Sequence, residues 1–185
     1  MTMNSTIAIR AALILTVLLA AQAAQAQTAT AITPESVLAE LNAWRSKSDL
    51  PPLRIDFRLQ HAAEDRLAEM LELGYWSHVG PDGRPPFRWI PLRGYRFARA
   101  GENLAAGFDT AEVLVASWME SPGHRQNVLG PDYVDVGVAV LEGSTIRRAA
   151  GLSVVVLFAR ERIAEPITPR ASQDRPRDTS GSCRR

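Results

Sequence analysis

The sequence predicts an α+β fold, a three-layer α-β-α sandwich in which a small central antiparallel sheet lies between helical layers. Segments with apolar residues at helical spacing precede two segments with strand patterns near the end of the chain. The chain has 185 residues, of which 46% are hydrophobic and 22% charged. This is enough for one globular domain with a core of its own.

Three longer helices are expected. Pro34 suits the first position of a helix, where its missing N–H costs nothing. The apolar residues that follow it form one buried stripe: Val37, Leu38, Leu41 and Trp44. A second helix is expected over 57–74, because Gly74 is placed to cap its C-terminus. A third is expected over 110–121, with Asp109 and Glu112 as its capping pair.

Two strands are expected near the end of the chain. The segment 133–141 alternates Val with other residues, which is the period of a strand. Residues 152–158 form a nearly continuous apolar run, which is typical of a strand covered on both faces of its sheet. Gly143 and Ser144 lie between the two segments and predict a turn.

The ends of the chain predict an exported protein. Residues 1–26 are interpreted as a signal peptide, with an apolar run over 11–20 and a small-x-small cleavage site that ends at Ala26. A retained signal anchor is the alternative, but the apolar run is short for a permanent membrane span. Residues 27–33 are expected to be a linker and 34–165 the folded domain. A disordered basic tail is expected over 166–185.

Charge and cysteine content exclude some classes of protein. The formal net charge is +1, with +3 in 166–185 and −3 in 27–165. A mildly acidic folded body argues against a nucleic-acid surface. Cys183 is the one cysteine, so an internal disulfide is excluded, and its thiol is expected to be free or crosslinked between molecules. We expect a monomer without a membrane-spanning segment once the signal peptide is removed.

Three short segments carry the candidate functional residues. His78 follows the second helix on a loop marked by Gly-Pro and Asp-Gly, where it could serve a site or only hydrogen-bond the loop. Glu102 stands between glycine and an apolar segment, where a buried carboxylate needs a partner or a proton. His124 follows the helix break Ser121-Pro122-Gly123 and is expected on a short turn that faces a cleft.

Taken in order, these segments resemble the CAP superfamily, the cysteine-rich secretory, antigen 5 and pathogenesis-related-1 group, in its bacterial single-domain form. The matching motifs are Tyr-Trp-Ser-His at 75–78, Gly-Glu-Asn at 101–103 and Ser-Pro-Gly-His-Arg with a following Asn at 121–127. The resemblance covers about 34–160 and implies the CAP sandwich. The absence of a disulfide framework departs from the eukaryotic members and suits a bacterial one.

The resemblance also implies a cavity in which two histidines and two acidic residues converge and can hold a divalent ion. His78, Glu102 and His124 match three of these positions. Ser121 stands where many members have the second acid, and the neighbouring Glu120 points about 100° away on a helix. Imidazole and carboxylate ligands suit Zn²⁺, so Zn²⁺ or another divalent cation is the one cofactor to consider. A polar pocket without any ion is the alternative.

The favoured function is a secreted or periplasmic binding module whose His/Glu-lined cavity recognises an extracellular ligand, such as a lipid or a component of the cell envelope. One alternative is a metal-dependent hydrolase with Glu102 as base. Ser121 and His124 could also be drawn as nucleophile and base, but Ser121 is better explained as the helix stop. A structural interaction domain with a vestigial cavity is the third possibility. We therefore favour binding over catalysis.

Overall fold

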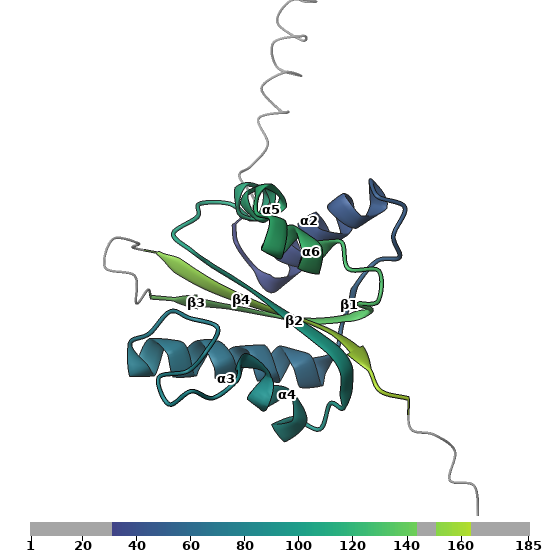
Figure 1. Ribbon diagram of the computed structural model, residues 1–185. Coiled ribbons are helices and arrows are strands. Elements are labelled where there is room, and N and C mark those ends of the chain that lie inside the picture. The colour runs from purple at the N-terminus through teal and green to yellow at the C-terminus, as the bar shows by residue number, and fades with distance from the viewer. Residues whose placement is uncertain (1–30, 144–150, 164–185) are drawn as a thin grey trace, which may run out of the picture.

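A computed structural model describes residues 31–143 and 151–163, and its elements form three layers (Figure 1). A four-stranded sheet lies in the middle. On one face lie the helices α2 (Pro34–Ser46), α5 (Ala111–Glu120) and α6 (Pro122–Val128). On the other lie α3 (Phe57–Leu73) and, after the 3₁₀ turn η1 (Pro86–Arg88), the short helix α4 (Trp89–Leu92). The predicted α-β-α sandwich is confirmed.

The sheet has the strand order β1-β3-β4-β2. Its strands are β1 (Arg54–Ile55), β2 (Phe97–Ala106), β3 (Asp135–Glu142) and β4 (Leu152–Glu161). The strand β4 pairs antiparallel with both β2 and β3. The antiparallel pair β3–β4 corresponds to the two strands predicted over 133–141 and 152–158. The two-residue strand β1, which the sequence pattern did not indicate, is parallel to β3.

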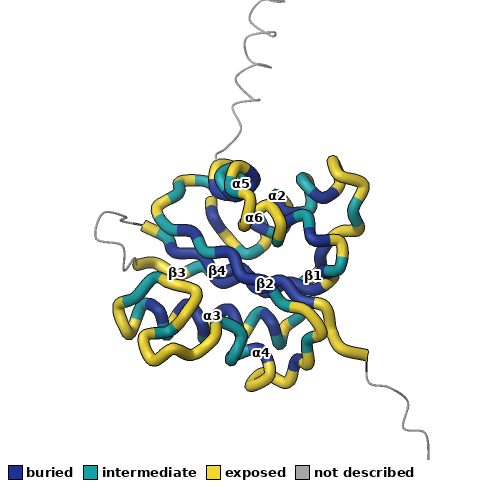
Figure 2. The backbone as a smooth tube through the Cα atoms, viewed as in Figure 1, coloured by how far each residue is buried: buried dark blue, intermediate teal, exposed yellow. Residues whose placement is uncertain are grey.

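The strand β4 is the centre of the core (Figure 2). Val154, Val156 and Phe158 point to one face and pack with apolar residues of α2 and α5. Val155 and Leu157 point to the other face and pack with those of α3. Both faces of β4 are therefore covered, which explains why its sequence is apolar without alternation.

The ends of the long helices follow local sequence signals. Thr33 and Ser36 form a capping box at the start of α2, next to Pro34 in the first turn. Gly74 caps α3 in the left-handed conformation with φ 69°. The prediction of Asp109 as the cap of α5 was wrong, because the cap is Thr110, whose hydroxyl accepts a hydrogen bond from Val113 N.

The helix α6 is a further difference from prediction. Ser121 is extended (φ −92°, ψ 119°), so the predicted break is confirmed. However, Pro122 then starts a new helix instead of a turn, and His124 lies in the first turn of α6. Proline at the first helical position needs no N–H and has a suitable φ. The Pro-Gly pair therefore redirects the helix without ending helical structure.

The expected signal peptide (1–26), the basic tail (166–185) and Cys183 lie outside the described residues. Only 31–33 of the expected linker are described, and there Ile32 is buried in the core, so packing starts before Pro34. Of the described helices, none has the length and apolar character needed to cross a membrane.

The helix α3 approaches β3 very closely at Gly137. A Cβ atom at this position would lie 2.1 Å from the carbonyl oxygen of Leu59, which belongs to the backbone and cannot rotate away. We expect Gly137→Ala to destabilise the protein by at least about 2 kcal/mol, because α3 would have to move from the sheet. The matched control is Gly123→Ala, whose new Cβ would meet nothing within 4 Å in α6. Urea unfolding followed by circular dichroism measures both, and equal midpoints would contradict the prediction.

Gln60 extends the hydrogen-bond ladder where β1 ends. The carbonyls of Val134 and Val136 accept from the backbone N–H groups of Arg54 and Asp56. At the next position, Gln60 Nε2 donates to Val138 O at 2.7 Å, and Val138 N donates to Gln60 Oε1 at 3.0 Å. The side-chain amide of Gln60 thus takes the place of a third strand residue.

Candidate functional site

The strand β2 carries two buried polar side chains that point to opposite faces of the sheet. Glu102 bonds to groups on the α3 side, and Asn103 bonds to groups on α6. Successive residues of a strand alternate between faces, so the motif Gly-Glu-Asn places one polar group toward each helical layer. The strand thereby connects the segment that carries His78 to the helix that carries His124.

Glu102 is shared between two cationic side chains. Its carboxylate is 1% exposed, and Oε2 accepts from Arg66 Nε at 2.9 Å. Oε1 lies 2.7 Å from His78 Nδ1, and the side chain of His78 is 55% exposed. The prediction that Glu102 needs a partner is confirmed, since a buried carboxylate is tolerated only when it is paired. His78 does not merely bond its own loop but reaches across to β2.

Arg66 also fixes the segment that carries His78. Its side chain is 2% exposed and donates to Ser77 O at 2.7 Å, His78 O at 3.0 Å and the hydroxyl of Tyr75. Burial acts against its charge, but the hydrogen bond and the Coulombic attraction to Glu102 raise the pKa of Arg66. Sequence reasoning missed Arg66, although its position on α3 falls on the same stripe as Ala62 and Met70.

A pair of asparagines holds His124 against β2. Asn127 Nδ2 donates to Asn103 Oδ1 at 2.9 Å and to Glu102 O at 3.1 Å. Asn103 Nδ2 donates in turn to His124 O at 3.2 Å. A Cβ atom on Gly101 would lie 2.6 Å from Asn127 Oδ1, so glycine is needed for α6 to approach this closely. The residues beside Glu102 and His124 in the two motifs therefore bind each other.

The two histidines have opposite protonation tendencies. The hydrogen bond to Glu102 raises the pKa of His78, although burial opposes the shift. Burial lowers the pKa of His124, and the charge on His78 lowers it further. The ring of His124 packs against Trp118, with the ring centroids 6.2 Å apart. The site therefore combines a His78 whose pKa is raised with a His124 whose pKa is lowered.

This difference predicts the order in which the histidines titrate. In ¹H NMR of the imidazole signals, we expect the pKa of His78 to lie above the ordinary value of 6.5 and the pKa of His124 below it. The pairing of His78 should contribute stability below pH 6.5 and lose it as pH rises through the raised pKa. His124 should destabilise the fold as pH falls from 6.5 through its lowered pKa, because a neutral, partly buried ring must then be charged. The chain has three histidines, so His78→Gln and His124→Gln assign the signals, and the reverse order would contradict the prediction.

Among the described residues, the side chains of Ser121 and Glu120 form no hydrogen bond with His78, Glu102 or His124. Ser121 links α5 to α6, and the described residues contain no hydrogen bond between its hydroxyl and His124. Glu120 is exposed at the end of α5. The sequence residues that the structure connects by hydrogen bonds are therefore His78 and Glu102, with His124 held nearby through its backbone.

The donor set, as placed here, does not fit a three-ligand metal centre. Both oxygens of Glu102 are engaged, one of them by the positively charged Arg66. A guanidinium beside the carboxylate opposes a second cation at the same oxygens. Over 31–143 and 151–163, no group of three or more His, Cys, Asp or Glu residues is positioned to hold a metal ion. As placed, Glu102 therefore offers Zn²⁺ no free oxygen.

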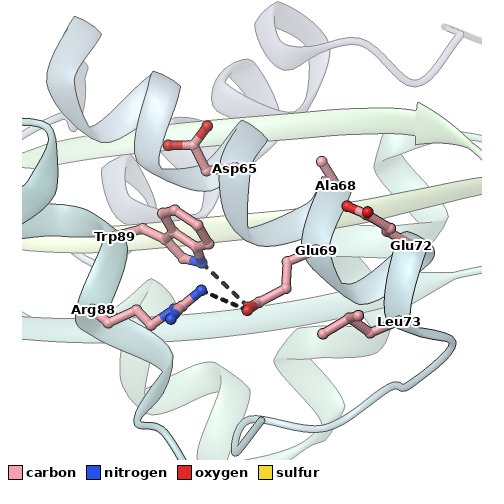
Figure 3. A pocket seen from close by; sticks show the side chains of 7 residues that line it. All are labelled: Asp65, Ala68, Glu69, Glu72, Leu73, Arg88 and Trp89. Carbon is pink, nitrogen blue, oxygen red and sulfur yellow. Dashed lines mark hydrogen bonds and ion pairs between the residues drawn. The ribbon is translucent and has the colours of Figure 1, made fainter. Parts of the chain in front are cut away.

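A separate hollow of about 360 Å³ lies between α3 and α4 (Figure 3), on the face of the sheet opposite α6 (Figure 1). Glu69 is held there by Arg88 Nη2 at 2.7 Å and by Trp89 Nε1 at 3.3 Å. The guanidinium of Arg88 also stacks over the indole of Trp89 at 4.2 Å. The charge of Glu69 is neutralised within the protein, so this pairing serves to attach α4 to α3.

Comparison with known proteins identifies the family. The family model CAP, described as the cysteine-rich secretory protein family, matches residues 38–158. The chain belongs to the CAP family. The matched range begins in α2 and ends in β4, and it includes His78, Glu102, Ser121 and His124. The resemblance seen in the sequence is confirmed.

Several bacterial proteins are similar to the chain. YkwD, an uncharacterized protein of Bacillus subtilis, is 38% identical over 105 residues, which are 57% of this chain and 41% of YkwD. YlbC, an uncharacterized membrane protein of the same organism, is 31% identical over 109 residues, which are 58% of this chain and 32% of YlbC. The match thus spans less than half the length of either curated relative.

Two solved structures of CAP proteins superpose on the chain. An outer surface protein from Borrelia burgdorferi gives a TM-score of 0.60 at 25% identity, covering 68% of this chain and 90% of its own. An extracellular protein with an SCP domain from Bacillus anthracis gives 0.61 at 25% identity, covering 69% of this chain and 40% of its own. The CAP fold is therefore shared with extracellular and outer surface proteins.

Proposed function

We propose that the chain is an exported binding module that recognises an acidic group of a cell-envelope component at the face formed by His78 and His124. The observation that carries the proposal is that Arg66 and His78 share the single carboxylate of Glu102. Arg66 also pairs with Glu69 at 3.5 Å, and Glu69 pairs with Arg88 at 2.7 Å. When His78 is protonated, this connected cluster therefore has three positive side chains (Arg66, Arg88 and His78) and two negative ones (Glu69 and Glu102). The half-exposed imidazole can then donate from its free Nε2 to a carboxylate or phosphate oxygen.

Export supports an envelope ligand. The first residues have the pattern of a signal peptide, and the chain resembles proteins described as extracellular or as outer surface proteins. Lipid headgroups supply phosphate oxygens, and wall polymers supply carboxylates and phosphates. The shared chemistry is an anionic oxygen.

The same geometry disfavours hydrolysis. A general base must have an oxygen free to accept a proton from the attacking water, whereas both oxygens of Glu102 are occupied by protein groups. No orienting carboxylate bonds the His124 ring among the described residues, so a Ser121–His124 nucleophile pair is incomplete. Binding is therefore preferred to catalysis.

The test is an NMR titration of the chain from Gln27 onward, with two probes run separately. Soluble dihexanoyl phosphatidylglycerol represents a lipid headgroup, and muropeptides represent the wall. We expect one probe to shift the imidazole signals of His78 and His124 in a saturable manner and more strongly at pH 6 than at pH 8.5. His61 is an internal control, since it lies on α3 and pairs with Glu64 at 3.0 Å.

Variants separate the outcomes. His78→Ala should abolish the shifts, and His61→Ala should leave them unchanged. If neither probe shifted the imidazole signals of His78 and His124 selectively, the proposal would be wrong. A protein-interaction domain would then be favoured. Product release from either probe that is lost in Glu102→Gln would instead establish the hydrolase alternative.

A further inference from the structure

The strands β2 and β4 extend beyond the rest of the sheet and carry arginines there. Pairing of β3 with β4 begins at Ala159, whereas β2 follows β4 further, with Arg99 opposite Arg160 and Phe97 opposite Glu161. Figure 1 shows this end of β4 projecting past β3. Arg99, Arg125, Arg160 and Arg162 are all exposed and together are called the cationic edge.

The cationic edge is continuous. A hollow of about 380 Å³ is lined by Arg99, Arg160 and Arg162, and a second of about 390 Å³ is lined by Arg99 and Arg125. Arg99 lies between the two. The surface thus runs from the end of β4 across β2 to α6.

The positive charge of this edge is only partly compensated. Like charges directly opposite each other on neighbouring strands are destabilising, yet Arg99 and Arg160 are such a pair. Both share Asp132, at 2.6 Å and 3.6 Å. Glu161 is already engaged by Arg58 through both its oxygens, at 2.7 Å and 3.1 Å. Among the described residues, no carboxylate forms an ion pair with Arg125 or Arg162.

An apolar side chain projects from the same edge. Ile163 is 82% exposed and lines the hollow between Arg99 and Arg162. Exposed arginine beside an exposed aliphatic residue is the combination that favours the interface of an anionic bilayer, where the cations meet headgroups and the apolar group enters the acyl boundary. A soluble polyanion would contact the arginines but would offer no apolar environment to the exposed side chain of Ile163.

We propose that the cationic edge docks the domain on the surface of a bilayer that contains anionic phospholipid. It shares no residue with the His78–His124 face and goes beyond the function proposed for that face. The charge between 27 and 165 is −3, so attraction depends on this local cluster and not on the charge of the whole domain. The twenty residues from 166 onward, which follow this edge in the chain, carry a formal charge of +3.

The experiment is vesicle cosedimentation of the chain from Gln27 onward, because the apolar run before it would itself insert into bilayers. Vesicles of phosphatidylglycerol and phosphatidylcholine in equal amounts are compared with phosphatidylcholine alone, at low and at high salt. We expect binding only to the anionic vesicles and its loss at high salt. Arg125→Gln/Arg162→Gln should weaken binding by about thirtyfold.

The matched control is Lys47→Gln/Arg84→Gln, which removes the same charge from exposed positions on other parts of the surface. It should bind the vesicles as the wild type does. Ile163→Ser should weaken binding to vesicles but not to soluble polyglutamate. Equal binding of the Arg125/Arg162 variant and its control would overturn the proposal. So would polyglutamate binding as tight as vesicle binding, or no binding to anionic vesicles at low salt.

Discussion

Arg66→Met is expected to destabilise the protein by about 3–5 kcal/mol, because the buried charge of Glu102 loses its buried cationic partner and keeps the half-exposed His78. The side chains of Arg66 and Glu102 are 2% and 1% exposed, so water cannot replace the missing guanidinium. The carbonyls of Ser77 and His78 would lose their donor as well. Urea unfolding at pH 7, with two spectroscopic probes, measures the change.

Two further variants test this explanation. Arg93→Met also removes an arginine that pairs with a carboxylate, in this case through both oxygens of Asp65, but at a 46% exposed position. Its effect should stay below about 1 kcal/mol. The double variant Arg66→Met/Glu102→Leu should recover much of the lost stability, since no charge is left buried. A loss below about 1 kcal/mol for Arg66→Met alone would contradict the assignment of a buried ion pair.

Arg45→Met is expected to cost about 2–4 kcal/mol of stability, because several buried carbonyls would lose their donors. Arg45 is 0% exposed. It donates to Pro51 O, Val128 O and Gly130 O at 2.9 Å each, and to Tyr133 O at 3.2 Å. Burial lowers the pKa of Arg45, and the methionine would remove that desolvation cost, which is why the net loss is smaller than the sum of four hydrogen bonds.

The loss should be concentrated where these carbonyls lie. Arg45 closes the segment between α6 and β3, so amide hydrogen exchange in 128–133 should accelerate more than in β4. Arg45→Lys is the matched control, because its ammonium keeps the charge but cannot present the planar fork that reaches several carbonyls. It should fall between wild type and Arg45→Met. Exchange that accelerates equally in both regions would show that the arginine stabilises the fold globally and not this segment.

The burial of Arg45 and Arg66 was not predicted from the sequence. Helix starts and ends such as Pro34 and Gly74 depend on local conformation, so they were readable from the sequence. Arg45 and Arg66 lie on the same stripes as Leu41 and Ala62, four residues on, yet an arginine on a helix is usually exposed. Only the tertiary structure shows that carbonyls and a carboxylate from distant segments meet them.

For the candidate site, the sequence likewise predicted the residues but not their tertiary contacts. The positions of His78, Glu102 and His124 came from the motifs, and the structure places Glu102 between His78 and Arg66. That both its oxygens are engaged depends on a contact 36 residues apart in sequence, which no local pattern reveals. Likewise, the sequence did not predict the helix that carries His124, because adjacent proline and glycine usually indicate a turn.

The amide of Gln60 has a consequence for self-association. The strand β1 covers only Asp135 and Val136 of β3, and the edge beyond them would present unpaired N–H and C=O groups. Such an edge is a template on which another molecule can add a strand. By occupying both polar groups of Val138, Gln60 removes the first rung that an incoming strand would use. One glutamine side chain therefore opposes the addition of a strand from another molecule at this edge, without a longer edge strand.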